Sequence, residues 1–119
     1  MKNNRKKDRL AIDRESADQG EFFFAKFRLS DGVVYPRPVF VIGKKGDSND
    51  DGDVIICSCT STEKVRSVYD IEVKLKEDTL VRTNKIYTIS KKHLAFKIKH
   101  NVDAQTIQDI INSCQQAIS

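Results

Sequence analysis

The chain has 119 residues, a length that allows one compact domain with a modest core and excludes a second domain. Its mean hydropathy of −0.50 fits a soluble protein. No apolar run approaches the length of a membrane span, and no apolar stretch follows the basic N-terminus, so we expect neither a membrane partner nor a signal peptide. The net charge of +4 favours polyanionic partners, and an odd count of three cysteines argues against a disulfide framework and for the reducing cytoplasm.

Residues 1–19 form a basic segment with few apolar side chains. Its cations are Lys2, Arg5, Lys6, Lys7, Arg9 and Arg14. Such a segment cannot bury enough apolar surface to offset the entropy of ordering, so we expect a flexible N-terminal extension ahead of a domain at 20–119. The extension could act as an arm that touches nucleic acid, but its composition fits a short frayed helix without a role better.

The first strand of the domain is expected within residues 21–28. Period-2 alternation puts Phe23, Ala25 and Phe27 on one face, with Phe22 and Phe24 on the other. Three consecutive phenylalanines imply burial on both faces, as in a sheet that curls into a barrel.

The next strand begins with an arginine between two prolines. Pro36 and Pro38 fix their own φ angles and push Tyr35 and Arg37 toward extended backbone, and a β-branched and aromatic run follows to residue 42. A guanidinium held in this way is suited to binding phosphate, because its planar fork matches the phosphate oxygens. A solvated strand start is the equally compatible alternative.

The polar loop at 43–53 imitates part of a calcium-binding loop, and we interpret it as a plain surface connection. Its D-x-[DN]-x-[DN]-G pattern lacks the glutamate required at the twelfth position, where Ser58 stands, and both flanks look like strands. Cys57 and Cys59 point to one side of the following strand, but no Cys or His spacing of a metal knuckle accompanies them. We therefore expect no metal and no cofactor.

Three hydroxyl residues, Thr60, Ser61 and Thr62, follow this strand. Hydroxyls at strand ends are usually turn formers, and the other interpretation is a set of donors aimed at phosphate oxygens.

Alternation continues through the second half of the chain. It predicts strands at 69–75, 79–83, 86–89 and 94–99, and a helix capped by Asp103 whose apolar stripe comprises Ile107, Ile110, Ile111, Cys114 and Ile118. Such a stripe could pack on the sheet or support dimerisation. The sequence thus predicts a mainly β, strongly bent domain of six or seven strands with a C-terminal α-helix.

Several segments together resemble the PemK/MazF (Kid-like) toxins of bacterial toxin–antitoxin systems. They are GEFFF at 20–24, RPVFVI at 37–42, CTS at 59–61, VRTNKIYTI at 81–89 and the terminal helix, and the resemblance spans roughly residues 20–118. It implies a small SH3-like barrel of the CcdB/MazF/PemK type that forms a homodimer. The activity it implies is metal-independent, sequence-selective cleavage of single-stranded RNA through a 2′,3′-cyclic phosphate.

The resemblance also implies roles for individual residues. Arg37 would stabilise charge at the scissile phosphate, Thr60 would orient that phosphate, and Arg82 would act as an acid or phosphate ligand. RNA would be held by Ser61, Asn84 and Lys85. The Kid-like branch has an aspartate where this chain has Asn84, and an amide cannot accept a proton near neutral pH.

Two further hypotheses remain open at this point. One is a toxin of the same fold that poisons DNA gyrase, as CcdB relatives are thought to do, and the other is a non-catalytic module that binds RNA or a partner. A toxin of this family implies a cognate acidic antitoxin, with which the basic charge of this chain agrees.

Overall fold

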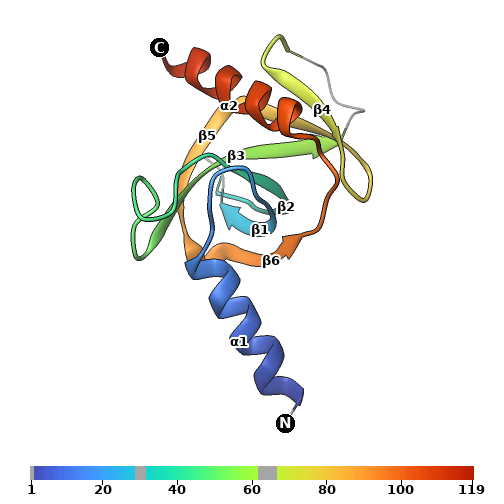
Figure 1. Ribbon diagram of the computed structural model, residues 1–119. Coiled ribbons are helices and arrows are strands. Elements are labelled where there is room, and N and C mark those ends of the chain that lie inside the picture. The colour runs from blue at the N-terminus through green and yellow to red at the C-terminus, as the bar shows by residue number, and fades with distance from the viewer. Residues whose placement is uncertain (1, 29–31, 62–66) are drawn as a thin grey trace.

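The computed structural model describes residues 2–28, 32–61 and 67–119 (Figure 1). The elements are α1 (Lys2–Glu15), β1 (Phe22–Arg28), β2 (Val34–Val41), β3 (Asp53–Ser61), β4 (Asp70–Lys74), β5 (Asp78–Ser90), the short 3-10 helix η1 (Lys91–His93), β6 (Leu94–Ile98) and α2 (Ala104–Ile118). The predicted mainly β architecture with a C-terminal helix is confirmed. The segments expected as two strands around Asn84 and Lys85 form one long strand, β5, because pairing with β3 resumes after a register shift.

The six strands found in the described residues all belong to one antiparallel sheet, in the order β4-β5-β3-β2-β1-β6. The sheet is open, with β4 and β6 at its edges, and it curls so that β3, β5 and β6 surround β1 and β2 (Figure 1). Phe27 of β1 contacts Tyr87 of β5 with ring centroids 5.7 Å apart, although two strands separate them in the pairing order. This contact across the curl shows how strongly the sheet bends.

Alternation along the strands builds two hydrophobic clusters, one on each side of the sheet. Phe23, Ala25 and Phe27 belong to the first cluster, inside the curl, with residues of β2, β3, β5 and β6. Phe22 belongs to the second cluster, where its ring packs edge-on against that of Phe40 with the ring centroids 5.1 Å apart. The predicted burial on both faces of β1 is therefore confirmed.

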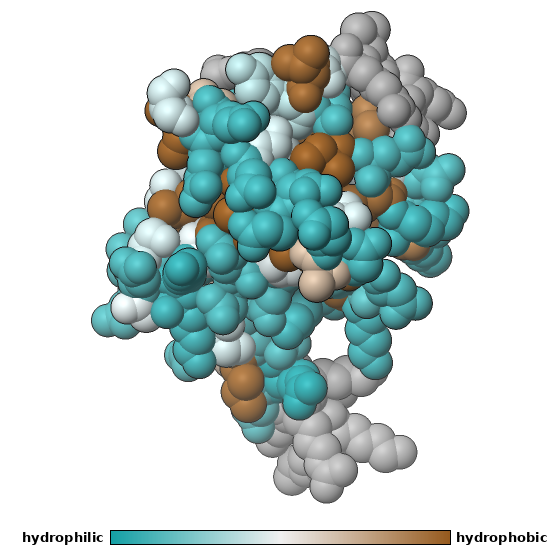
Figure 2. Space-filling view, turned by 45° about the horizontal axis from the view of Figure 1, so that its top comes forward, coloured by the Kyte–Doolittle hydropathy of each residue, from teal (hydrophilic) through white to brown (hydrophobic). Residues whose placement is uncertain are grey.

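Helix α2 covers the second cluster. Asp103 caps it by accepting a hydrogen bond from the backbone N–H of Thr106 at 2.7 Å, and Ile110, Ile111 and Cys114 are buried. The predicted stripe ends early, since Ile118 is 74% exposed. Figure 2 turns α2 forward and shows separate apolar areas among polar ones on this face.

Helix α1 extends away from the sheet, at the end of the molecule opposite α2 (Figure 1). Its C-terminal part is fastened to β6, because Nε of Arg14 donates a hydrogen bond to the carbonyl of Leu94 at 2.6 Å, and Ala17 just beyond it is buried in the first cluster. Among the described residues, none of the helices combines the length and apolar character needed to cross a bilayer. The flexibility of the extension stays a prediction.

The loop at 43–53 is organised by a buried asparagine. Asn49 Nδ2 donates hydrogen bonds to the carbonyls of Gly43 at 2.7 Å and Ala17 at 3.0 Å, and its Oδ1 accepts one from the N–H of Ile55 at 3.1 Å. A Cβ at Gly43 would lie 1.9 Å from Oδ1 of Asn49, so only glycine fits there. Asn49, which stands at the third position of the calcium-loop pattern that begins at Asp47, thus ties the loop to the domain.

We predict that Asn49→Ala lowers the free energy of unfolding by about 3 kcal/mol, because two buried backbone carbonyls and one part-buried N–H lose their partner. Urea denaturation followed by circular dichroism measures this. The matched control is Asn101→Ala, at an exposed asparagine, which should change stability by no more than about 0.5 kcal/mol. Equal effects of the two variants would contradict the assignment.

Candidate functional site

A groove opens where β2 and β3 separate. Their pairing ends at Val39 and Ser58, while β2 continues along β1 to Val34 and β3 continues along β5 to Ser61. Pro36 and Pro38 lie in the part of β2 that leaves β3, and neither has a backbone N–H with which to pair. The two prolines therefore favour the opening.

The groove has a volume of about 780 Å³ and combines several elements. Its floor includes Arg37 with the prolines on either side of it, and the end of β3. The turn at 75–77 between β4 and β5 and the start of β5 form one wall, and β1 and β6 form another with Phe24 and Phe96. Groove residues thus come from five of the six strands and from one turn.

Three of the predicted site residues lie together in this groove. Arg37 and Thr60 are half-buried and Ser61 is exposed, and all three line the same hollow. The Nε atom of Arg37 is buried, so its guanidinium is partly withdrawn from water, which strengthens its field. A cation and two hydroxyls arranged in this way can bind the oxygens of a phosphodiester. The third predicted hydroxyl, Thr62, lies outside the described residues.

The groove also contains a thiol, Cys59, which its environment keeps protonated. Burial raises the pKa of Cys59 far above its ordinary value, and the nearby positive charge of Arg37 only partly opposes that shift. Behind it, the Sγ atoms of Cys57 and Cys114 are 4.0 Å apart, and this contact together with burial raises the pKa of Cys57. The three cysteines are free, as expected from the odd count, and buried, so their thiols are shielded from a ligand in the groove.

The other predicted site residues lie outside the groove lining. Arg82 is half-buried on β5, opposite Asp70 of β4, and its Nε is 3.8 Å from an oxygen of that carboxylate, whose side chain is 1% exposed. Asn84 and Lys85 are exposed, in the part of β5 where the register with β3 shifts. Their functional roles stay predictions.

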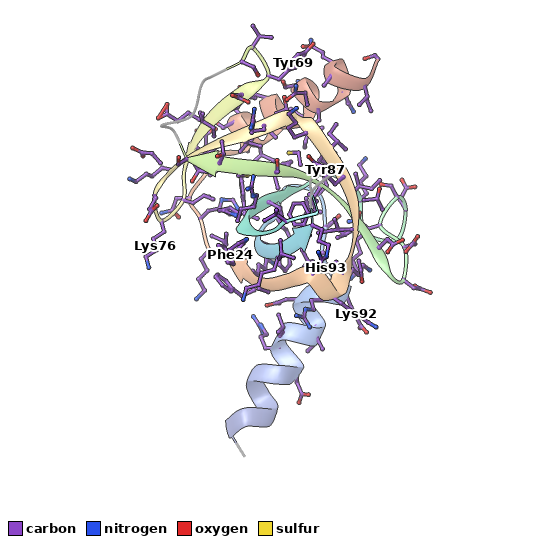
Figure 3. All side chains as sticks on the ribbon, turned by 180° about the vertical axis from the view of Figure 1, so that it is seen from behind. Phe24, Tyr69, Lys76, Tyr87, Lys92 and His93 are labelled. Carbon is purple, nitrogen blue, oxygen red and sulfur yellow. The ribbon has the colours of Figure 1, made fainter. Side chains whose placement is uncertain are left out.

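Sequence reasoning missed the aromatic and cationic walls of the groove. Phe24 and Phe96 stack with ring centroids 5.2 Å apart and planes inclined by 11°. Lys76, Lys97 and Lys99 also line the groove, and Figure 3 shows Lys76 on the β4–β5 turn. Alternation places Phe24 on the other face of β1 from Phe23. The pairing of β1 with β6, however, joins residues far apart in the chain, so no local sequence signal shows that Phe96 lies beside Phe24.

Comparisons with known proteins define the class of fold first. The toxin MazF-mt6 of Mycobacterium tuberculosis is 18% identical, with a TM-score of 0.64, and the match covers 82% of this chain and 95% of that one. A MazE–MazF structure from Deinococcus radiodurans is 13% identical, with a TM-score of 0.67 and coverages of 87% and 96%. A mycobacterial endoribonuclease in complex with its cognate antitoxin is 17% identical, with a TM-score of 0.65 and coverages of 85% and 93%. The fold is that of MazF proteins.

The family follows from the sequence itself. A family model described as PemK-like, MazF-like toxin of type II toxin–antitoxin system matches residues 18–118. The chain belongs to this toxin family, and the resemblance drawn from the motifs is confirmed. A search of curated proteins found no match.

We predict that the three thiols of the native protein resist a thiol reagent such as Ellman's reagent, because each is buried and the reactive species is the thiolate. All three should react within minutes once urea unfolds the chain. Ser119→Cys, at the exposed C-terminus, provides a control with one fast thiol. Rapid labelling of Cys59 in the native wild-type protein would contradict the burial described above.

Proposed function

We propose that this toxin is an endoribonuclease that cleaves single-stranded RNA, with sequence selectivity and without a metal ion. One observation carries the proposal: Arg37 and the hydroxyl residues Thr60 and Ser61 line the same groove. Membership of the toxin family supports it, as does the similarity of the fold to that of a mycobacterial endoribonuclease.

Cleavage by the 2′-hydroxyl requires stabilisation of charge on the phosphorus centre. The 2′-oxygen attacks the adjacent phosphorus, the bond to the 5′-oxygen breaks, and a 2′,3′-cyclic phosphate and a 5′-hydroxyl result. We assign Arg37 to the charge that develops on the phosphate oxygens, and Thr60 to a hydrogen bond that orients them. Ser61, exposed beside Thr60, would hold the adjoining RNA.

Proton transfer requires a second kind of group. An arginine is a poor base because its pKa lies far above neutral pH, and Asn84 cannot accept a proton. Among the described lining residues, Glu77 and Asp78 carry carboxylates, and Asp78 already pairs with Lys74 at 3.1 Å.

Arg82, held by Asp70, is proposed as an acid or phosphate ligand that acts with RNA bound, and Asn84 and Lys85 as RNA contacts beside it.

The proposal includes partners. An acidic antitoxin would neutralise the toxin by covering the cationic groove, and similar folds have been solved with a cognate antitoxin or as MazE–MazF. We further propose a homodimer acting in the cytoplasm.

In the decisive experiment, purified protein is incubated with a long single-stranded RNA in EDTA, and the ends are mapped. We expect discrete cuts with cyclic phosphate ends, and a loss of rate of about a hundredfold or more in Arg37→Ala, because a charge-stabilising donor of this kind contributes about that much. Thr60→Ala should slow cleavage as well. An acidic antitoxin added to the same assay should stop it.

Matched controls are Arg28→Ala and Thr88→Ala, which remove the same groups from exposed positions outside the groove. Both should cut like the wild type. Intact RNA at high protein concentration, together with growth arrest on expression, would contradict the proposal and favour a gyrase-poisoning toxin. Binding to RNA without cleavage or toxicity would favour a non-catalytic module.

A further inference from the structure

The groove contains an aromatic pair, Phe24 and Phe96, that belongs to neither hydrophobic cluster. Phe96 lies on the edge strand β6 directly opposite Phe24 of β1, and the two rings are nearly parallel, at 5.2 Å. Phe96 is 53% exposed and Phe24 is half-buried, whereas Phe22 and Phe23 beside it are fully buried. An exposed phenylalanine in a hollow is an apolar surface that a ligand can cover.

The alternation of the sheet explains why this pair is uncovered. Phe22, paired with Phe40 and Ile98, lies in the cluster beneath α2. Phe24 is two residues further along the same face, opposite Pro38 and Phe96, and all three line the groove. The aromatic pair therefore adjoins the proline next to Arg37.

The groove that contains the aromatic pair is also lined by cations. Lys76, Lys97 and Lys99 line the same groove, and Figure 3 shows Phe24 and Lys76 on one side of the molecule. The Nζ atom of Lys97 lies 2.6 Å from a carboxylate oxygen of Glu21, so this ion pair partly offsets the charge of Lys97. Flat aromatic rings flanked by positive charge are the combination with which proteins bind single-stranded nucleic acid, because each base has a stacking face and each link carries a negative charge.

We propose that Phe96, supported from behind by Phe24, stacks on an unpaired base of the RNA strand whose phosphate lies at Arg37. This inference rests on the proposed function and adds a binding residue to it. The occupant is a nucleobase rather than an apolar side chain of an antitoxin, because the wall is a pair of parallel rings among lysines. Phe96 contributes binding, and the cleavage chemistry belongs to the floor of the groove.

The test measures binding separately from cleavage. A fluorescent 2′-O-methyluridine 12-mer has no free 2′-hydroxyl and cannot be cut, and a second 12-mer carries abasic residues instead of bases. We expect the wild type to bind the first about tenfold more tightly than the second, as one stacked base provides. Phe96→Ala should reduce this preference to about twofold or less while leaving affinity for the abasic strand unchanged.

Phe96→Tyr keeps the ring and should retain the preference, and Val68→Ala is the control at an exposed apolar residue outside the groove. Thermal unfolding checks that each variant folds. If Phe96→Ala loses affinity equally for both 12-mers, or for neither, the inference is overturned. It is also overturned if this variant binds RNA like the wild type but no longer binds the antitoxin.

The two proposals fail differently. A wild-type protein that prefers the base-bearing strand but leaves RNA intact would refute the nuclease and retain the stacking residue. A wild-type protein that cuts RNA, with a Phe96→Ala variant that binds and cuts identically, would refute the stacking residue and retain the nuclease.

Discussion

The site depends on one constraint, the separation of β2 from β3 beyond Val39 and Ser58. Two prolines at the start of β2 cannot donate to a ladder, so the strand follows β1 instead and leaves the end of β3 to β5. The gap places a guanidinium and two hydroxyls in one hollow. A continuous ladder at this point would fill that hollow with backbone and leave no room for a substrate.

The rest of the fold holds this gap open. The curled sheet is packed on its inner side by one cluster and on its outer side by α2, so β1, β2 and β3 are each fixed on two faces. Thr83 reinforces the arrangement at β5, since its hydroxyl donates to the carbonyl of Tyr69 at 2.5 Å and shares a 2.7 Å hydrogen bond with Ser113 of α2. The walls of the groove are more exposed, as Phe96 and Lys76 of the β4–β5 turn illustrate, and exposed side chains can contact a ligand.

Local patterns in the sequence predict much of this fold, and long-range pairing decides the remainder. Alternation located most strands and both faces of β1, and Asp103 marked the start of α2. The shared groove of Arg37 and Thr60 was expected from the family resemblance, because no spacing joins residues on separate strands. The three backbone partners of Asn49 lie up to 32 positions away in the chain. The sequence therefore showed its match to a calcium-loop pattern but not its structural role. Phe96 and the ion pair of Arg82 with Asp70 likewise depend on strand register, which composition does not reveal.

The central claim is that Arg37 and Thr60 act on the same phosphodiester, and a double-mutant cycle on the rate of RNA cleavage tests it most directly. Single-turnover rates would be measured for the wild type, Arg37→Ala, Thr60→Ala and the double variant. The account predicts strong non-additivity: once one side chain is lost, removing the other should cost far less than it does in the wild type. Losses that simply multiply would contradict the claim, because they would mean that the two side chains contribute independently.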